Sequence, residues 1–171
     1  MAIQSSKIIL RSCVIAAVSG AFGVAMVYPS LSQSPHATVM KFGGSWNGGG
    51  TITPLSGGNE RVNCRVTFDV KASTFAQDIN CSGPTKKFDI DSSLNTQGNN
   101  IEGKWSDKVS GYSGGASGTV GTNKIDLRIE GPGFNGKMDI AISGGSQTVR
   151  VTQYDVKTKG YKTVADIKLS K

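Results

Sequence analysis

From residue 41 onward, hydrophobic and polar positions alternate along the chain with a period of two. The clearest stretch is Arg61–Val70, where every second side chain from Val62 onward is apolar and the residues between are mostly polar. This alternation predicts a half-buried antiparallel strand, with one face toward a core and the other toward solvent. The pattern recurs at 87–91, 125–130, 134–142 and 161–169. In the last segment it predicts one buried face made of Tyr161, Thr163, Ala165, Ile167 and Leu169.

Turn-forming sequences separate these segments. Gly, Pro, Asn and Ser cluster at 56–59, 82–84, 97–100, 121–123, 131–133 and 144–145. Eight to ten short strands joined by tight turns predict an all-β, antiparallel up-and-down meander. Because each strand must bury one face and exposed sheet edges favour aggregation, we expect a closed or strongly curled barrel. A β-sandwich is the alternative. An outer-membrane barrel is not expected, because lipid would reject the charges on the polar face of nearly every strand.

Two cysteines lie in neighbouring predicted strands. If the strands form one hairpin that turns at 71–74, Cys64 faces Cys81, and the same register pairs Val66 with Ile79. Residues directly opposite in an antiparallel pair are close enough for a disulfide. The sequence therefore predicts a cross-strand Cys64–Cys81 disulfide. A redox-active pair is the alternative, although no C-x-x-C motif is present.

The first forty residues differ from the rest of the chain. Lys7 and Arg11 precede an apolar stretch from about 12 to 28, and Pro29 and small residues follow. This order predicts a secretory signal peptide at 1–32, cleaved after Ser32. The alternative is a retained N-terminal anchor. We expect a linker at 33–40 and a single domain at 41–171, periplasmic or extracellular, with no membrane span after cleavage.

The formal net charge of the chain is +7, and Lys7 and Arg11 contribute two of those charges. A basic exported domain could favour an anionic envelope polymer or lipid. Its lysines and arginines are scattered, however, and Lys86–Lys87 is the only adjacent pair after residue 41. Few aromatic residues and no basic cluster argue against nucleic acid as a partner.

Catalytic and metal-binding patterns are weak. His36 is the only histidine and lies in the predicted linker. The G-x-S-x-G match at 111–115 has no helix or histidine after it. Asp89 and Asp91 share a strand face, but no third acid accompanies them in sequence. The glycine run 48–50 lacks the Lys-Ser/Thr ending of a phosphate loop. We therefore expect no enzyme activity, catalytic residues, metal or cofactor.

Both tryptophans follow a glycine at the same spacing. Gly44 precedes Trp46, and Gly103 precedes Trp105, within segments of strand-like alternation. A glycine in a strand indicates a bend or a close approach of the backbone, and an aromatic ring can cover it. We expect both rings on the buried face, with the glycines making room for them. These four residues are the candidate ligand-binding residues.

A Gly-x-Trp near the start of a β-meander resembles the calycin barrels, which include the lipocalins and avidins. The resemblance implies a tryptophan that closes one end of the barrel and a small apolar ligand held at the other. The stretch from Gly44-Ser45-Trp46 to Val120 is also similar to exported proteins of unknown function from Gram-negative bacteria.

The sequence thus predicts a secreted, non-catalytic binding protein. Its partner would be a small apolar ligand inside the barrel or an anionic envelope component on its surface. The alternative is a protein–protein module, such as a hydrolase inhibitor whose segment 34–39 enters an active site.

Overall fold

The computed structural model describes residues 39–71 and 73–171. The predicted signal peptide or anchor and His36 lie outside the described residues. So does the predicted linker, except for Val39 and Met40, which are helical. Within the described ranges, no helix is long and apolar enough to cross a membrane.

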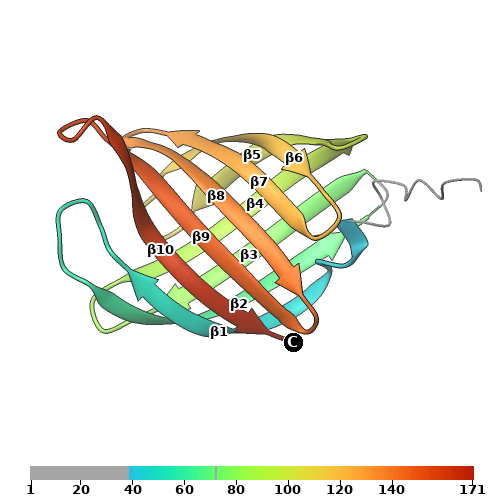
Figure 1. Cartoon of the computed structure of the whole chain (residues 1–171), viewed down its shortest axis with the longest axis horizontal. Helices are drawn as coiled ribbons and strands as arrows, with labels where there is room; N and C mark the ends of the chain where they lie inside the picture. Colours follow the sequence, from blue (N-terminus) through green and yellow to red (C-terminus); the bar gives the residue numbers. More distant parts are fainter. Residues whose placement is uncertain (1–38, 72) are drawn as a thin grey trace, which may run out of the picture. The chain divides into compact units, whose positions relative to one another are not determined.

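Ten antiparallel strands form a closed barrel (Figure 1). Each strand pairs with its neighbours in sequence, and the last pairs with the first. The predicted up-and-down barrel is confirmed, and the alternative sandwich is wrong. The strands are β1 (Gly44–Ile52), β2 (Glu60–Val70), β3 (Thr74–Ser82), β4 (Lys87–Gln97), β5 (Asn100–Asp107), β6 (Ser113–Val120), β7 (Lys124–Gly131), β8 (Phe134–Ser143), β9 (Ser146–Asp155) and β10 (Gly160–Ser170).

Because the strands run up and down, their connections alternate between the two ends of the barrel. One end carries the connections after β2, β4, β6 and β8, together with the start of β1 and the C-terminus, and we call it the closed end. The other end, the open end, carries the loops 53–59, 83–86, 108–112, 132–133 and 156–159. In Figure 1 the closed end is on the right, beside the C-terminus, and the open end is on the left.

The closed end is sealed by the segment that leads into β1. Val39, Phe42 and Trp46 are almost completely buried. The Phe42 N–H donates to the Val39 carbonyl over 3.0 Å, and the Trp46 indole N–H donates to the Phe42 carbonyl over 2.8 Å. The rings of Phe42, Phe68 and Phe75 form a continuous aromatic row, with centroids 6.5 and 5.2 Å apart. Val39 therefore belongs to the core, although the sequence placed it in a linker.

Glycines in β1 allow close approach of the neighbouring strand. Gly48 lies opposite Leu169 of β10, and Gly50 lies opposite Ile167. A Cβ at Gly48 would overlap the Lys168 carbonyl, and a Cβ at Gly50 would overlap the Asp166 carbonyl. Any residue with a side chain would push β1 and β10 apart. The close approach that the sequence indicated is present, and it serves the pairing of strands.

The alternation predicted for the last strand fails at one point. The register between β9 and β10 shifts between Thr163 and Ala165, so Val164 is an extra residue in β10, which forms a β-bulge. Ala165, Ile167 and Leu169 face the interior as predicted, but Tyr161 and Thr163 face outward. A bulge reverses the parity of the residues before it, which simple alternation cannot show.

The predicted hairpin register of β2 and β3 is confirmed. Cys64 lies opposite Cys81, and Val66 lies opposite Ile79. The two cysteines form a disulfide with a Cα–Cα distance of 4.1 Å, and both face the interior. The Lys71 N–H donates to the Thr74 carbonyl, which closes the turn where the sequence placed it.

Removing this disulfide is expected to destabilise the barrel without changing its fold. The cysteines are separated by 17 residues. In the chain-entropy model a loop of this length contributes about 3 kcal/mol to the free energy of unfolding. Guanidinium unfolding of the Cys64→Ala/Cys81→Ala variant should show a loss of this order, and reduction of the wild type should give a similar loss. Two alkylatable thiols at 64 and 81 in the oxidised protein would contradict the assignment.

Candidate functional site

The inward-facing apolar side chains are buried to different extents at the two ends. At the closed end nearly all are fully buried, and only Val70 and Ile142 at its edge are partly exposed. Toward the open end, on β4, β5 and β7–β9, the inward side chains are only half-buried. These residues, which we call the mouth, are Phe88, Ile90, Trp105, Ile129, Phe134, Met138 and Val151. The open half of the barrel therefore keeps an apolar inner wall within reach of solvent.

The two tryptophans lie at opposite ends of the barrel. Trp46 is 1% exposed in the sealed end, where the Lys171 ammonium lies 4.9 Å from its ring centre. Trp105 is half-buried in the mouth, and its indole N–H donates to the Glu130 carbonyl over 3.2 Å. The four candidate residues are thus not brought together. Gly44 and Trp46 belong to the closed end, and Gly103 lies midway along β5, facing Leu94 and Ala116.

Small residues on β6 let the backbone of β7 come close beside Trp105. A Cβ at Gly114 would overlap the Glu130 carbonyl, and a Cβ at Gly118 would overlap the Asp126 carbonyl. The interior positions of β6 are Gly114, Ala116, Gly118 and Val120, so this strand brings no large side chain to the inside. The Trp105 ring lies over Gly131 of β7, where an added Cβ would come within 2.7 Å of the ring. The tryptophan covers a glycine two strands away rather than the glycine in its own strand.

Three carboxylates order the loops of the open end. Glu60 accepts hydrogen bonds from the backbone N–H groups of Thr85 and Lys86 and from the Thr85 hydroxyl, and these bonds lower the pKa of Glu60. Burial raises the pKa of Asp107, but hydrogen bonds from the Ser110 hydroxyl and from backbone N–H groups outweigh burial and lower it. These acids act as caps of turns, which fixes the shape of the rim.

Asp155 has the same role in the hairpin between β9 and β10. Its carboxylate lies 2.6 Å from the Lys162 ammonium and accepts a hydrogen bond from the Lys157 N–H over 2.9 Å. The ion pair with Lys162 and these hydrogen bonds lower the pKa of Asp155 to about 2. The bulge at Val164 is what turns Lys162 inward, toward Asp155.

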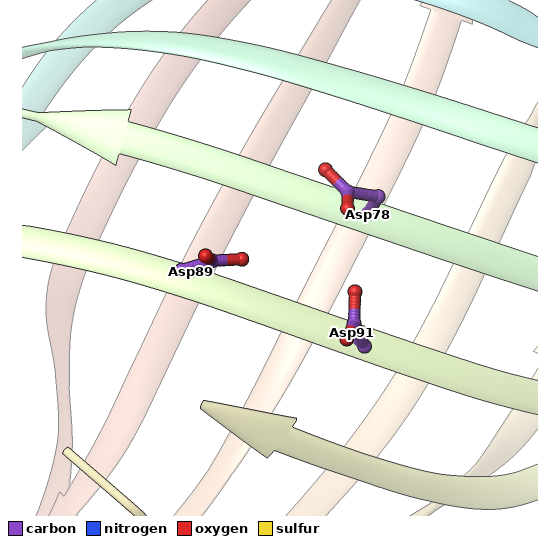
Figure 2. A group of neighbouring side chains, drawn as sticks. All are labelled: Asp78, Asp89 and Asp91. Atoms are coloured by element: carbon purple, nitrogen blue, oxygen red, sulfur yellow. The ribbon is translucent and has the colours of Figure 1, made fainter. Parts of the chain in front are cut away.

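Three acids meet on the outer wall of β3 and β4 (Figure 2). From the sequence we expected Asp89 and Asp91 to have no third acid beside them. That expectation is wrong, because strand pairing places Asp78 opposite Asp91. One oxygen from each lies within 4.8 Å of the others, so a hard cation such as Ca²⁺ fits the donor set. The Lys108 ammonium, 2.7 Å from Asp91 and 3.5 Å from Asp89, already neutralises part of this charge.

Two hollows on the outer wall are bordered by charged side chains. One, of about 350 Å³, crosses β4–β7 beside Gly115 and is bordered by Lys104, Arg128 and Glu130. The other, of about 490 Å³, crosses β10, β1 and β2 beside Gly49 and is bordered by Arg61 and Lys168. Their mixed charge suits water better than an apolar molecule.

Two buried glutamines face the interior. Gln147 is 1% exposed, and neither polar atom of its side chain has a hydrogen-bond partner in the described part of the chain. Gln77 is also buried, and its amide nitrogen is likewise unpaired there, while its oxygen lies 3.4 Å from the Ser92 hydroxyl. Unpaired buried amides are uncommon in folded proteins and destabilise them.

Comparison with known proteins shows the fold. No protein-family model and no curated protein matches the sequence. Among solved structures, the chain is similar to Rv2717c from M. tuberculosis, with a TM-score of 0.63 and 13% identity over 78% of this chain and 96% of that chain. It is also similar to the S-type phycobiliprotein lyase CPES from Guillardia theta, with a TM-score of 0.56 and 12% identity over 81% and 92%.

Both structures are calycin-like β-barrels, so the calycin resemblance drawn from Gly-x-Trp is confirmed at the level of fold. Identities this low carry no residue-level function. The similarity to exported proteins of unknown function stays a prediction.

Replacing Gln147 by methionine is expected to stabilise the protein. Methionine has a similar shape but no amide to leave unpaired, so the free energy of unfolding should rise by about 1–2 kcal/mol. Chemical denaturation measures the change, and Gln153→Met is the control, because Gln153 donates a hydrogen bond to the Gly133 carbonyl. A Q147M variant less stable than the wild type would show that the Gln147 amide has a partner.

Acid is expected to weaken the β9–β10 hairpin through Asp155. Because its pKa is lowered on folding, ionised Asp155 stabilises the native state above about pH 4, and this contribution is lost as the pH falls toward 2. The difference in Tm between wild type and Asp155→Asn should therefore be largest above pH 5 and shrink steadily as the pH falls from 4 through 2. Asp69→Asn, which loses only an exposed ion pair with Lys71, should change Tm little at any pH. A difference as large at pH 2 as at pH 6 would contradict this role.

Proposed function

We propose that this protein is a non-catalytic binding protein that takes a small apolar ligand into the open end of its barrel, against the mouth. The observation that carries the proposal is the difference between the two ends. The inward-facing apolar side chains around Trp46 are almost completely buried, whereas those around Trp105 are only half-buried. A monomeric protein gains stability by burying apolar side chains, and an inner wall left partly exposed is typical of a surface that a ligand covers.

The chemistry of the mouth supports an apolar ligand. Its seven side chains are aliphatic, aromatic or thioether groups, and methionine adapts readily to ligands of different shape. At the edge, Gln153 and the Asp155–Lys162 pair lie close to the solvent. Deeper in the barrel, Ser92 lies beside Trp105 and its hydroxyl contacts Gln77. Such an arrangement favours a ligand whose apolar body lies inside the barrel and whose polar end lies at the rim.

The lowered pKa values and the hydrogen bonds of the rim carboxylates favour a role in binding rather than catalysis. Glu60, Asp107 and Asp155 all accept several hydrogen bonds, and each has a lowered pKa. A general acid or base needs a pKa near the working pH. These groups are ionised and occupied as turn caps.

The proposal includes export from the cytoplasm. The N-terminal pattern predicts a signal peptide, and a disulfide within the barrel suits an oxidising compartment. The hydrolase-inhibitor alternative receives no support from Val39, which is buried in the protein's own core.

A charge placed in the mouth is expected to abolish ligand binding. Met138→Lys puts an ammonium group among the apolar side chains, whereas Asn135→Lys puts the same group on the outward face of the same strand. We expect M138K to raise the Kd of a neutral apolar fluorescent probe, N-phenyl-1-naphthylamine, by roughly tenfold or more, since desolvating a charge is unfavourable. N135K should bind the probe like the wild type.

Titration by fluorescence, with thermal unfolding of each variant to confirm the fold, gives the answer. The proposal is wrong if the folded wild type does not bind the probe, or if M138K and N135K bind it equally well.

A further inference from the structure

The exposed large apolar side chains are concentrated at one end of the barrel. Leu55, Val109, Tyr112 and Val156 all lie in loops of the open end, with 38%, 56%, 57% and 77% of their surface exposed. The connections at the closed end are built from Gly, Ala, Ser, Thr, Asn and Lys. Met40 is the one exposed large apolar residue near that end within residues 39–71 and 73–171. The rim around the mouth therefore carries apolar tips that the opposite rim lacks.

The hairpin between β9 and β10 carries the most exposed of these apolar side chains, Val156. Val156 lies at its tip, and below it Tyr154 and Tyr161 pack edge to face on the outer wall, with ring centres 5.5 Å apart. Tyr161 faces outward because of the bulge at Val164. The Lys137 ammonium lies 4.6 Å from the Tyr161 ring centre. Tyrosines set below an apolar tip match the level at which such side chains lie in a membrane interface.

The charge of the open-end loops is entirely positive. They contain four lysines and no acidic residue, and the lysines are Lys86, Lys108, Lys157 and Lys159. In the described chain Lys86, Lys157 and Lys159 form no ion pair, and neither does Lys87 at the start of β4. The rim acids Glu60, Asp107 and Asp155 are engaged as turn caps. The trio of Asp78, Asp89 and Asp91 lies on the outer wall, and Lys108 is paired with two of its members.

We propose that the open end of the barrel docks onto an anionic lipid surface, with Val109 and Val156 inserted among the lipids and the loop lysines against the headgroups. Single apolar tips on separate loops, with Val109 next to Lys108 and Val156 next to Lys157, suit a fluid interface that closes around each tip. A protein partner would instead match one contiguous apolar patch. The loops 53–59 and 156–159 project from the same end (Figure 1), and the strand order puts the loop 108–112 at that end as well.

Docking in this orientation turns the mouth toward the bilayer. An apolar ligand then passes between lipid and barrel without crossing water. The docking surface and the mouth use different residues, so either function can fail while the other remains.

Flotation with lipid vesicles tests the docking. The protein, purified from cells that export and process it, is mixed with vesicles of phosphatidylcholine alone or with added phosphatidylglycerol. We expect binding to the anionic vesicles only, weakening as salt is raised. Lys157→Gln/Lys159→Gln should weaken binding roughly 25-fold, since each lysine near an anionic surface contributes about fivefold. Val109→Asp/Val156→Asp should weaken it by roughly tenfold or more, since the inserted tips lose their apolar character.

Matched variants at the closed end provide the controls. Lys41→Gln/Lys71→Gln removes the same charge, and Asn99→Asp/Thr122→Asp adds the same charge, at exposed positions far from the mouth. Both should bind anionic vesicles like the wild type, and all four variants should still bind the neutral probe N-phenyl-1-naphthylamine. The docking proposal is overturned if the wild type does not bind anionic vesicles or binds neutral vesicles equally well. It is also overturned if the closed-end variants lose as much affinity as the open-end variants. Loss of a protein partner by the open-end variants, without vesicle binding by the wild type, would identify a protein interface and also overturn it.

Discussion

Closure of the barrel depends on the pairing of β1 with β10, and that pairing depends on glycine. Gly48 and Gly50 lie where the carbonyls of β10 leave no space for a Cβ. Without closure, β1 and β10 would be two exposed edges, and the inward face of every strand would lose its partner across the barrel. The glycine run beside Trp46 is therefore a device for closing a sheet. It is neither a phosphate loop nor, at these two positions, a ligand pocket.

The two ends of this closed barrel are built differently. The segment Val39–Phe42 and the Trp46 ring seal one end with apolar side chains and buried hydrogen bonds. At the other end, the loops of the described chain are instead held by carboxylates that cap turns, at Glu60, Asp107 and Asp155. Sealing one end confines any ligand entry to the other. Ordered loops with apolar tips then give that entrance a defined surface.

Much of the fold was predictable from the sequence, because alternation of period two fixes which face of a strand is buried. The Cys64–Cys81 pairing followed from one hairpin register for the same reason. The outward face of Tyr161 did not, because a bulge at Val164 reverses parity without changing composition. Nor did the meeting of Asp78 with Asp91, which needs strand pairing. The two Gly-x-Trp motifs look alike in sequence, and β1 and β5 run in the same direction. They lie at opposite ends because Trp46 is near the start of β1 and Trp105 is near the end of β5.

The position of one tryptophan at each end offers the most direct test of the central claim, that an apolar ligand enters at the open end. A fatty acid that carries a nitroxide quencher is added to Trp46→Phe and Trp105→Phe variants, each of which retains one emitting tryptophan. If the ligand binds in the mouth, the emission of Trp105 is strongly quenched and that of Trp46 is nearly unchanged. Equal quenching of both tryptophans, or stronger quenching of Trp46, would contradict the account.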